Sequence, residues 1–149
     1  MQGKGVLLAP MPSSVVIAGI YSLPGPDGAL PHPDDEYIVL VNLGEEPVDM
    51  RGWSLTNRKQ DQVHHYRYLF PRFLSNGDPW ELEPGGLILL YTGRGTNGCT
   101  ATTGEAHQYH LYQHRSTRVW TEAGDTACLY DRSGALVTEW ALPAVRRTA

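Results

Sequence analysis

This chain has few cysteines and no long apolar run, and each shortage excludes a class of protein. Its 149 residues include only two cysteines, Cys99 and Cys128. Two cysteines cannot build the disulfide framework of a small secreted domain, and the sequence leaves open whether these two pair. No segment approaches the roughly 18 consecutive apolar residues that a transmembrane helix needs. We therefore expect one domain that folds around its own hydrophobic core and has no membrane span.

The N-terminal segment lacks the apolar stretch of a secretory signal peptide. Its short apolar run, residues 6–9, is interrupted at once by Pro10 and Pro12. The sequence as written therefore indicates a cytoplasmic protein.

Positive charge is also scarce. Twelve lysines and arginines stand against sixteen aspartates and glutamates, which gives a formal net charge of −4. This balance disfavours a basic surface for nucleic acid, although a local patch and weak polyanion binding stay open as alternatives. Arginines beside tyrosines such as Tyr109 and Tyr112 suit protein binding or single-stranded nucleic acid. The arginines available for such a surface are Arg67, Arg72, Arg94, Arg115, Arg118, Arg146 and Arg147, of which Arg94 and Arg115 are our candidate binding residues.

Common catalytic motifs are missing as well. The chain has no Gly-x-Ser-x-Gly elbow of a serine hydrolase. The glycine-rich residues 92–98 lack both the Gly-Lys-Ser/Thr sequence and the following helix of a phosphate-binding loop. We therefore predict a non-catalytic protein without a cofactor.

Short strand signals dominate what is present. Runs of β-branched and aromatic residues recur about every ten residues, separated by turns rich in glycine and proline, which is typical of a β-sandwich or barrel. The expected strands are 15–22, 36–42, 48–55, 64–70, 86–92, 109–114, 126–131 and 135–140. Residues 57–63 are expected to form a hairpin turn, and residues 93–108 lack apolar periodicity and are expected to form a disordered or functional loop.

The strand at 36–42 is apolar on both faces. Side chains alternate along a strand, so Tyr37, Val39 and Val41 share the face opposite Ile38 and Leu40. An apolar outer row needs either a covering segment or a partner. We expect Tyr37, Val39 and Val41 to mediate binding to a protein partner or to a second copy of the chain.

Alternation also assigns residues to the core in later strands. Trp53 and Leu55 should enter the core after a bend at Gly52. Tyr66, Tyr68 and Phe70 should share one face of their strand, and Cys128 should face away from the core, opposite Ala127 and Leu129.

The order of several segments resembles the lamin tail domain family. They are Glu-Tyr-Ile-Val-Leu-Val-Asn from residue 36, Val-Asp-Met-Arg-Gly-Trp-Ser-Leu from residue 48, Leu-Glu-Pro-Gly-Gly from residue 82, Tyr-Thr-Gly-Arg-Gly from residue 91, and Gly-Asp-Thr-Ala-Cys-Leu-Tyr-Asp from residue 124. The resemblance covers residues 15–140, with most similarity to small bacterial members. The resemblance implies an immunoglobulin-like β-sandwich, and it implies no known activity. Because many bacterial relatives are exported, it also implies that the protein could be extracellular.

Three histidines, His107, His110 and His114, are the best candidates for a metal site. Zinc in hydrolases is often held by three protein ligands, and imidazole is a common one. On a strand, His110 and His114 share a face and His107 points away. Exposed polar residues in and beside a loop are the simpler interpretation, so a metal-dependent hydrolase stays an alternative.

Two acidic features have structural interpretations. Asp34, Asp35 and Glu36 together could hold calcium, but they lack the order of an EF-hand loop and are better read as solvated charges before a strand. Asp125 is expected to cap backbone amides in the turn that precedes it.

We thus expect an all-β, immunoglobulin-like sandwich over residues 15–142, with flexible tails at 1–14 and 143–149. Its expected role is protein binding or scaffolding without catalysis.

Overall fold

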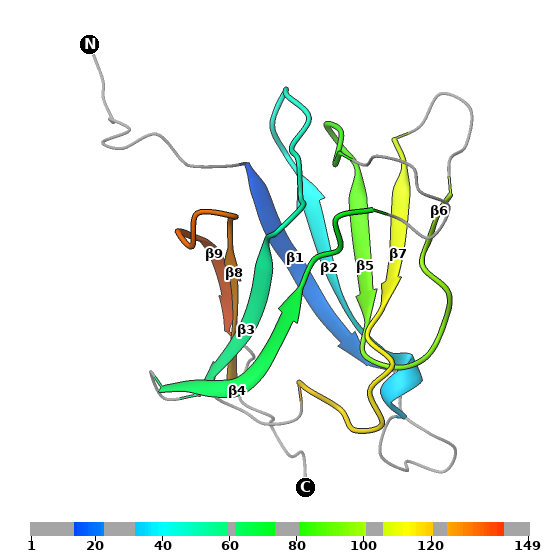
Figure 1. Cartoon of the computed structure of the whole chain (residues 1–149), viewed down its shortest axis with the longest axis vertical. Helices are drawn as coiled ribbons and strands as arrows, with labels where there is room; N and C mark the ends of the chain where they lie inside the picture. The colour runs from blue at the N-terminus through cyan, green and yellow to red at the C-terminus, as the bar shows by residue number, and fades with distance from the viewer. Residues whose placement is uncertain are drawn as a thin grey trace, which may run out of the picture.

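Two β-sheets packed face to face make up the fold (Figure 1). The computed structural model describes residues 14–22, 32–59, 62–73, 81–100, 106–120 and 125–141. The five-stranded sheet has the order β1 (Val15–Ser22), β2 (Glu36–Asn42), β5 (Leu87–Tyr91), β7 (Gln108–Tyr112), β6 (Gly98–Thr100). The four-stranded sheet has the order β4 (Gln62–Leu69), β3 (Ser54–Lys59), β8 (Asp125–Tyr130), β9 (Leu136–Ala141). The predicted immunoglobulin-like β-sandwich is confirmed.

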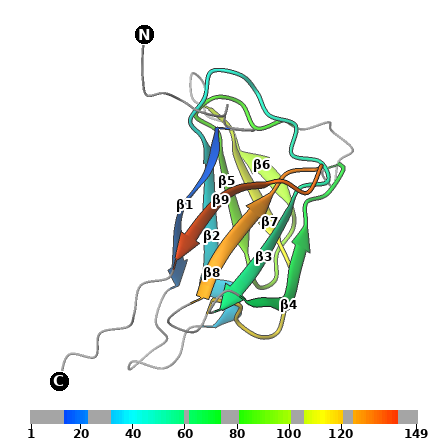
Figure 2. The same ribbon diagram turned by 90° about the vertical axis from the view of Figure 1, so that its left-hand side faces the viewer.

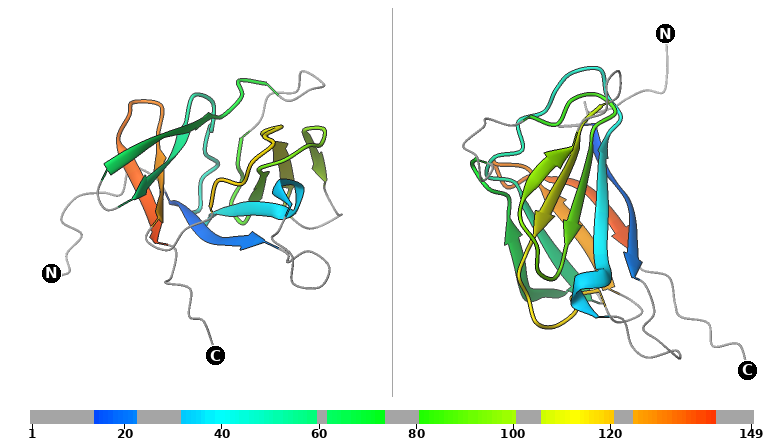
Figure 3. Two further views of the ribbon diagram at one scale, coloured as in Figure 1. Left: turned by 90° about the horizontal axis from the view of Figure 1, so that it is seen from below. Right: turned by 90° about the vertical axis from the view of Figure 1, so that its right-hand side faces the viewer.

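Strand pairing is antiparallel except between β5 and β7, which run parallel. A parallel pair needs a crossover, and here the crossover carries β6, which pairs antiparallel with β7 at the sheet edge. The two sheets approach each other where β1 lies beside β9 (Figure 2). Seen from below, the two layers are distinct, and the 3₁₀ turn η2 (Pro33–Asp35) lies at the start of β2 (Figure 3).

Alternation along the strands produces the core. On β2, Ile38 and Leu40 are fully buried, whereas the residues between them are half-buried. Complete burial of such side chains contributes about 1.5–3 kcal/mol each to folding. The predicted core residues Trp53, Leu55, Tyr66 and Phe70 are buried, and Tyr68 packs against them. Further core residues include Val15, Ile17, Met50, Leu82, Ile88, Leu90, Leu111, Ala127, Leu129 and Val137.

Strand β3 of the β3–β4 hairpin begins later and ends later than the sequence predicted. The strand expected at 48–55 begins only at Ser54, because Gly52 has a φ of 78° and turns the chain, and Val48 forms only an isolated bridge with Leu82. At its other end β3 continues to Lys59, into the segment 57–63 that was expected to be a turn, and β4 begins within the same segment at Gln62. The polar residues 57–59 stay extended because β8 supplies backbone partners along the whole strand. Those backbone hydrogen bonds do not depend on side-chain polarity.

The segment 93–108 was expected to be an irregular loop, and the described part of it contains a strand. Gly98, Cys99 and Thr100 pair with His110, Tyr109 and Gln108. Three residues at a sheet edge are too few to show a periodic apolar pattern, so the sequence carried no signal for β6. Residues 101–105 lie outside the described residues.

The predicted tails also lie outside the described residues, except for Ser14. Its carbonyl accepts a hydrogen bond from the Leu43 amide at 3.1 Å, and its hydroxyl donates to Asn42 Oδ1 at 2.8 Å. The described part of the chain contains no helix with the length and apolar character of a membrane span.

Candidate functional site: the outer face of the five-stranded sheet

Four tyrosines form a continuous row across the outer face of the five-stranded sheet. Tyr37 on β2 lies opposite Tyr21 on β1 and opposite Tyr91 on β5, and Tyr91 lies opposite Tyr112 on β7. The row therefore crosses four neighbouring strands at one level. We call Tyr21, Tyr37, Tyr91 and Tyr112 the tyrosine row.

The rings of the tyrosine row lean against one another. Successive ring centroids are 5.3, 5.2 and 4.8 Å apart, with interplanar angles of 26°, 38° and 11°. These spacings match the distance of about 4.8 Å between strands, so each ring covers a face of the next. Ring faces within the row are therefore occupied by neighbouring rings, and are less open to the stacking of nucleobases.

Apolar side chains continue the face beyond the tyrosine row. Val39 lies opposite Leu89, and Val41 lies opposite Leu87, all on strands β2 and β5. They are half-buried, and Tyr21 at the margin of the row is 48% exposed. The structure thus brings Tyr37, Val39 and Val41 together on one face, as alternation predicts, and places the rest of the row beside them.

This outer face carries no formal charge on its four long strands. The outward positions of β2, β5 and β7 hold tyrosine, valine, leucine, glutamine and His110, and β1 adds Val16 and Gly19. The His110 ring stacks on Tyr91 with centroids 6.3 Å apart. We refer to this region as the aromatic face. Its members beyond Tyr37, Val39 and Val41 were not identified from the sequence, because cross-strand register is not visible in it.

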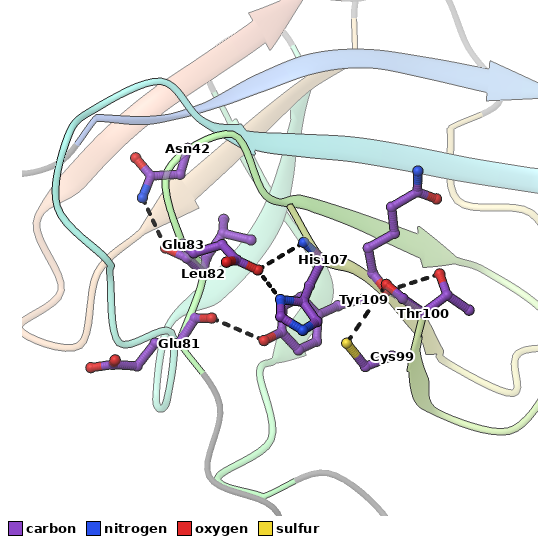
Figure 4. A network of polar contacts seen from close by, with 9 residues as sticks. Asn42, Glu81, Leu82, Glu83, Cys99, Thr100, His107 and Tyr109 are labelled. Carbon is purple, nitrogen blue, oxygen red and sulfur yellow. Dashed lines mark hydrogen bonds and ion pairs between the residues drawn. The ribbon is translucent and has the colours of Figure 1, made fainter. Parts of the chain in front are cut away.

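The three histidines proposed as metal ligands do not converge. His107 lies at the start of β7, where its amide donates to Glu83 Oε1 at 2.7 Å and its ring nitrogen Nδ1 contacts the same carboxylate (Figure 4). His110 lies on the aromatic face with Nε2 3.3 Å from the Thr100 hydroxyl. His114 follows the far end of β7, so that roughly 20 Å of extended backbone, at about 3.3 Å per residue, separates it from His107. Zinc requires ligand nitrogens about 2.0–2.1 Å from one ion, and no group of three metal-ligating side chains occurs in the described ranges.

Asp34, Asp35 and Glu36 lie in three different environments. The interpretation of Glu36 as a solvated charge is wrong. Asp35 is exposed, but Glu36 is fully buried on the inner face of β2. Its carboxylate accepts hydrogen bonds from the Thr92 hydroxyl at 2.6 Å and from the amides of Val119 and Trp120 at 2.8 and 3.1 Å. The even spacing of Glu36 with Ile38 was the available signal for this burial.

Asp34 binds both the backbone amide and the side chain of Arg94. Its carboxylate accepts a hydrogen bond from the Arg94 amide at 2.8 Å and from the Arg94 guanidinium at 3.2 Å. The bond from the Arg94 amide is the largest influence that holds the pKa of Asp34 below its ordinary value. The structure therefore links the chain before β2 to the chain after β5.

Arg94 and Arg115 come together in space although 21 positions separate them in sequence. They line one cavity of about 300 Å³ with His32, Asp34, His114 and Ser116. Arg67 and Arg72 are exposed, whereas Arg146 and Arg147 lie outside the described residues. Tyr109, which was expected to share their surface, is instead buried, and its hydroxyl donates to the Glu81 carbonyl at 3.0 Å (Figure 4).

Neither cysteine takes part in a disulfide bond. Cys99 is exposed on β6, and Cys128 is buried on β8 in the other sheet. Cys128 was expected to face away from the core. It is not part of the core cluster that contains Ala127 and Leu129, but it is fully buried, and its Sγ lies 3.9 Å from Glu139 Oε2. Asp125 is buried at the start of β8, but the turn that it was expected to cap, residues 121–124, lies outside the described residues.

Asn42 holds the opposite end of the sandwich together. Its Nδ2 donates to the Leu82 carbonyl at 2.8 Å (Figure 4). Nδ2 also donates to the Glu46 carbonyl at 2.8 Å, and Oδ1 accepts from the Gly44 amide at 2.9 Å. One buried side chain thus fixes two loops, which is a structural rather than a chemical role.

The comparison with known families agrees with this architecture. The family model described as Lamin Tail Domain matches residues 9–143, nearly the whole chain. No curated protein sequence matches the chain. Domains of this immunoglobulin-like type are generally interaction modules without catalytic activity. The match, together with the observed β-sandwich, shows that this chain belongs to the lamin tail domain family.

Proposed function

We propose that this protein is a non-catalytic binding module that associates with protein through the aromatic face, and that a second copy of the chain is one such partner. The observation that carries the proposal is the tyrosine row with the adjoining valines and leucines. Tyrosine is enriched where binding energy concentrates in protein interfaces, because it adds a large apolar area and a hydroxyl at little entropic cost.

The lack of charge on the aromatic face favours self-association. In a two-fold symmetric dimer the same patch meets itself, so a patch with charges of one sign would meet charges of that same sign on the other copy. The outward residues of β1, β2, β5 and β7 on this face include no lysine, arginine, aspartate or glutamate. Two copies can therefore meet there without repulsion between like charges.

The size of the face indicates weak association. Four strands about 4.8 Å apart and five residues of about 3.3 Å each cover only roughly 19 by 17 Å. A stable interface buries about 800 Å² on each partner, more than this flat area supplies. We therefore expect a concentration-dependent dimer rather than an obligate one.

Analytical ultracentrifugation over a range of concentrations tests the proposal. The variant Val39→Glu with Val41→Glu places two carboxylates on the aromatic face and should stay monomeric where the unmodified protein dimerises. A matched control is Leu69→Glu with Leu136→Glu, because these leucines are 59% and 44% exposed and lie on the other sheet. The control should dimerise normally.

A monomer at every concentration up to the millimolar range would remove self-association from the proposal. Equal loss of association in both double variants would place the contact elsewhere. Binding of another protein is tested separately, with the two double variants as paired baits in a pull-down. A partner captured by the control and lost by the valine variant supports the aromatic face, and a partner retained by both contradicts it.

A further inference from the structure

A cavity at one end of the sandwich gathers positive charge on an acidic protein. It lies where η2 precedes β2 and where the chain leaves β5 and β7, at the lower end of Figure 1. His32 and Asp34 come from the first of these segments, Arg94 from the second, and His114, Arg115 and Ser116 from the third. Three segments remote in sequence therefore supply its walls.

The backbone around this cavity is tightly fixed. The His114 amide donates to the Gly93 carbonyl at 2.7 Å, and the Arg115 amide donates to the Thr92 carbonyl at 2.9 Å. Gly93 lies so close to Asp34 that an added Cβ atom would be 1.9 Å from Asp34 Oδ1. These contacts hold the segments after β5 and β7 against η2, so the cavity walls are set before any ligand arrives.

His114 has an unusual backbone conformation. Its φ is 57°, the one positive φ at a non-glycine position in the described part of the chain. For such a residue the left-handed region costs about 1–2 kcal/mol. Backbone strain of this kind is common at functional sites, where it orients a side chain in a direction that an unstrained backbone does not allow. Here it places an imidazole on the cavity wall beside Arg115.

The charges that line the cavity do not cancel. Two guanidinium groups, from Arg94 and Arg115, face one carboxylate, from Asp34, whose oxygens are already bonded to Arg94. Arg115 lies over the Tyr66 ring, with Cζ 5.2 Å from the centroid, which restricts where its guanidinium can point. The two guanidinium groups and one carboxylate therefore give the lining a net positive charge, while the whole chain carries −4.

We propose that this cavity, lined by Arg94, Arg115, His114 and His32, binds the phosphate or carboxylate group of a small ligand. Arginine presents planar N–H donors that match both oxyanions, and a serine hydroxyl and imidazole N–H groups add further donors. A volume of about 300 Å³ is at the lower end of ligand sites, which suits one oxyanion with a small attached group. The site is separate from the aromatic face and does not depend on self-association.

Backbone NMR of the full chain, titrated with inorganic phosphate and separately with acetate at constant ionic strength, tests the site. We expect saturable shifts of the amide signals of Arg94, His114 and Arg115 at millimolar ligand, and little change at Arg67. The Arg115→Gln variant should weaken binding about tenfold, because it removes one charge without touching the contact between Asp34 and Arg94. Saturation by phosphate alone assigns a phosphate site, and saturation by acetate alone assigns a carboxylate site.

The matched control is Arg67→Gln, which removes the same charge from an exposed position outside the cavity. If both glutamine variants weaken binding equally, the effect is the overall charge of the protein and the proposal is overturned. It is also overturned if neither anion produces saturable shifts at these amides. Thermal melting of both variants checks that each is folded, so that loss of binding is not loss of structure.

Discussion

The carboxylate of Glu36 accepts a hydrogen bond from the amide of Trp120, 84 residues further along the chain, at 3.1 Å. Its other oxygen accepts bonds from the Val119 amide and the Thr92 hydroxyl. One buried side chain therefore attaches the segment after β7 to the start of β2. Two backbone donors that no strand satisfies obtain their partners from this carboxylate.

Replacement of Glu36 should strongly destabilise the domain. Glu36→Ala removes three hydrogen bonds and leaves two amides without partners, so we expect a loss of about 3–5 kcal/mol in the free energy of unfolding. Glu36→Gln keeps the shape but sets an NH₂ donor against N–H donors, and should cost about 1–3 kcal/mol. Urea unfolding measures both. Asp35→Asn is the control, since Asp35 is the exposed neighbour, and a change as large as that of Glu36→Gln would contradict the assigned role.

Replacement by alanine should destabilise the protein at Gly93 and have little effect at Gly98. At Gly93 a Cβ atom would lie 1.9 Å from Asp34 Oδ1 and 2.6 Å from backbone atoms of Asp34, so Gly93→Ala should cost about 1–3 kcal/mol. At Gly98 a Cβ atom would have no heavy atom within 4 Å, so Gly98→Ala should change stability by less than about 0.5 kcal/mol. Thermal denaturation of the two variants in parallel tests the packing of η2 against the end of β5. Equal melting temperatures would count against it.

The ion pair of Asp49 with Arg51 should make stability depend on acid pH. The Arg51 guanidinium donates to Asp49 and lowers the pKa of that carboxyl to about 2. Because this pKa is depressed in the folded state, the stabilisation is complete above about pH 4 and is lost as pH falls toward 2. Solvent screening limits it to about 1 kcal/mol.

The measurement is the free energy of unfolding from pH 6 to pH 2.5 for the unmodified protein, Asp49→Asn and Arg51→Met. Each variant should be less stable at pH 6 and should approach the unmodified protein at pH 2.5. A difference that stays constant across this range would show that the pair does not act through charge.

The two cysteines should differ in reactivity toward a thiol reagent. Cys99 is exposed, so one thiol should react rapidly in the folded protein. Cys128 is buried, and burial raises the pKa of its thiol, so it should react only on unfolding. In the Cys99→Ser variant only the Cys128 thiol can react, so its rate of labelling measures how often β8 becomes exposed. Rapid labelling of that variant under native conditions would contradict the burial of Cys128.

Alternation and turn chemistry predicted much of this fold. The faces of β2, the bend at Gly52 and the core positions of Trp53, Leu55, Tyr66 and Phe70 are local consequences of side-chain direction along a strand. The predicted strand boundaries were wrong where pairing with a remote segment determines whether residues are extended. β3 extends through polar residues because β8 pairs with it, and β6 exists because β7 offers an edge.

The candidate surfaces divide in the same way. Tyr37, Val39 and Val41 could be named from one strand because apolar residues on an outward face are a local signal. Tyr21, Tyr91 and Tyr112 join them through register, which is set by three separate strand pairings. Arg94 and Arg115 could be named as available charges, but not as neighbours, because the parallel pairing of β5 with β7 brings their segments together.

The sequence by itself therefore determined the all-β class, the family and the inward side of most strands, since these depend on patterns within a few residues. Tertiary structure alone decided that four tyrosines share one row, that two arginines line one cavity and that the Glu36 carboxylate binds the amides of Val119 and Trp120. Those outcomes depend on which strands pair and in which register, and pairing joins residues that lie dozens of positions apart along the chain.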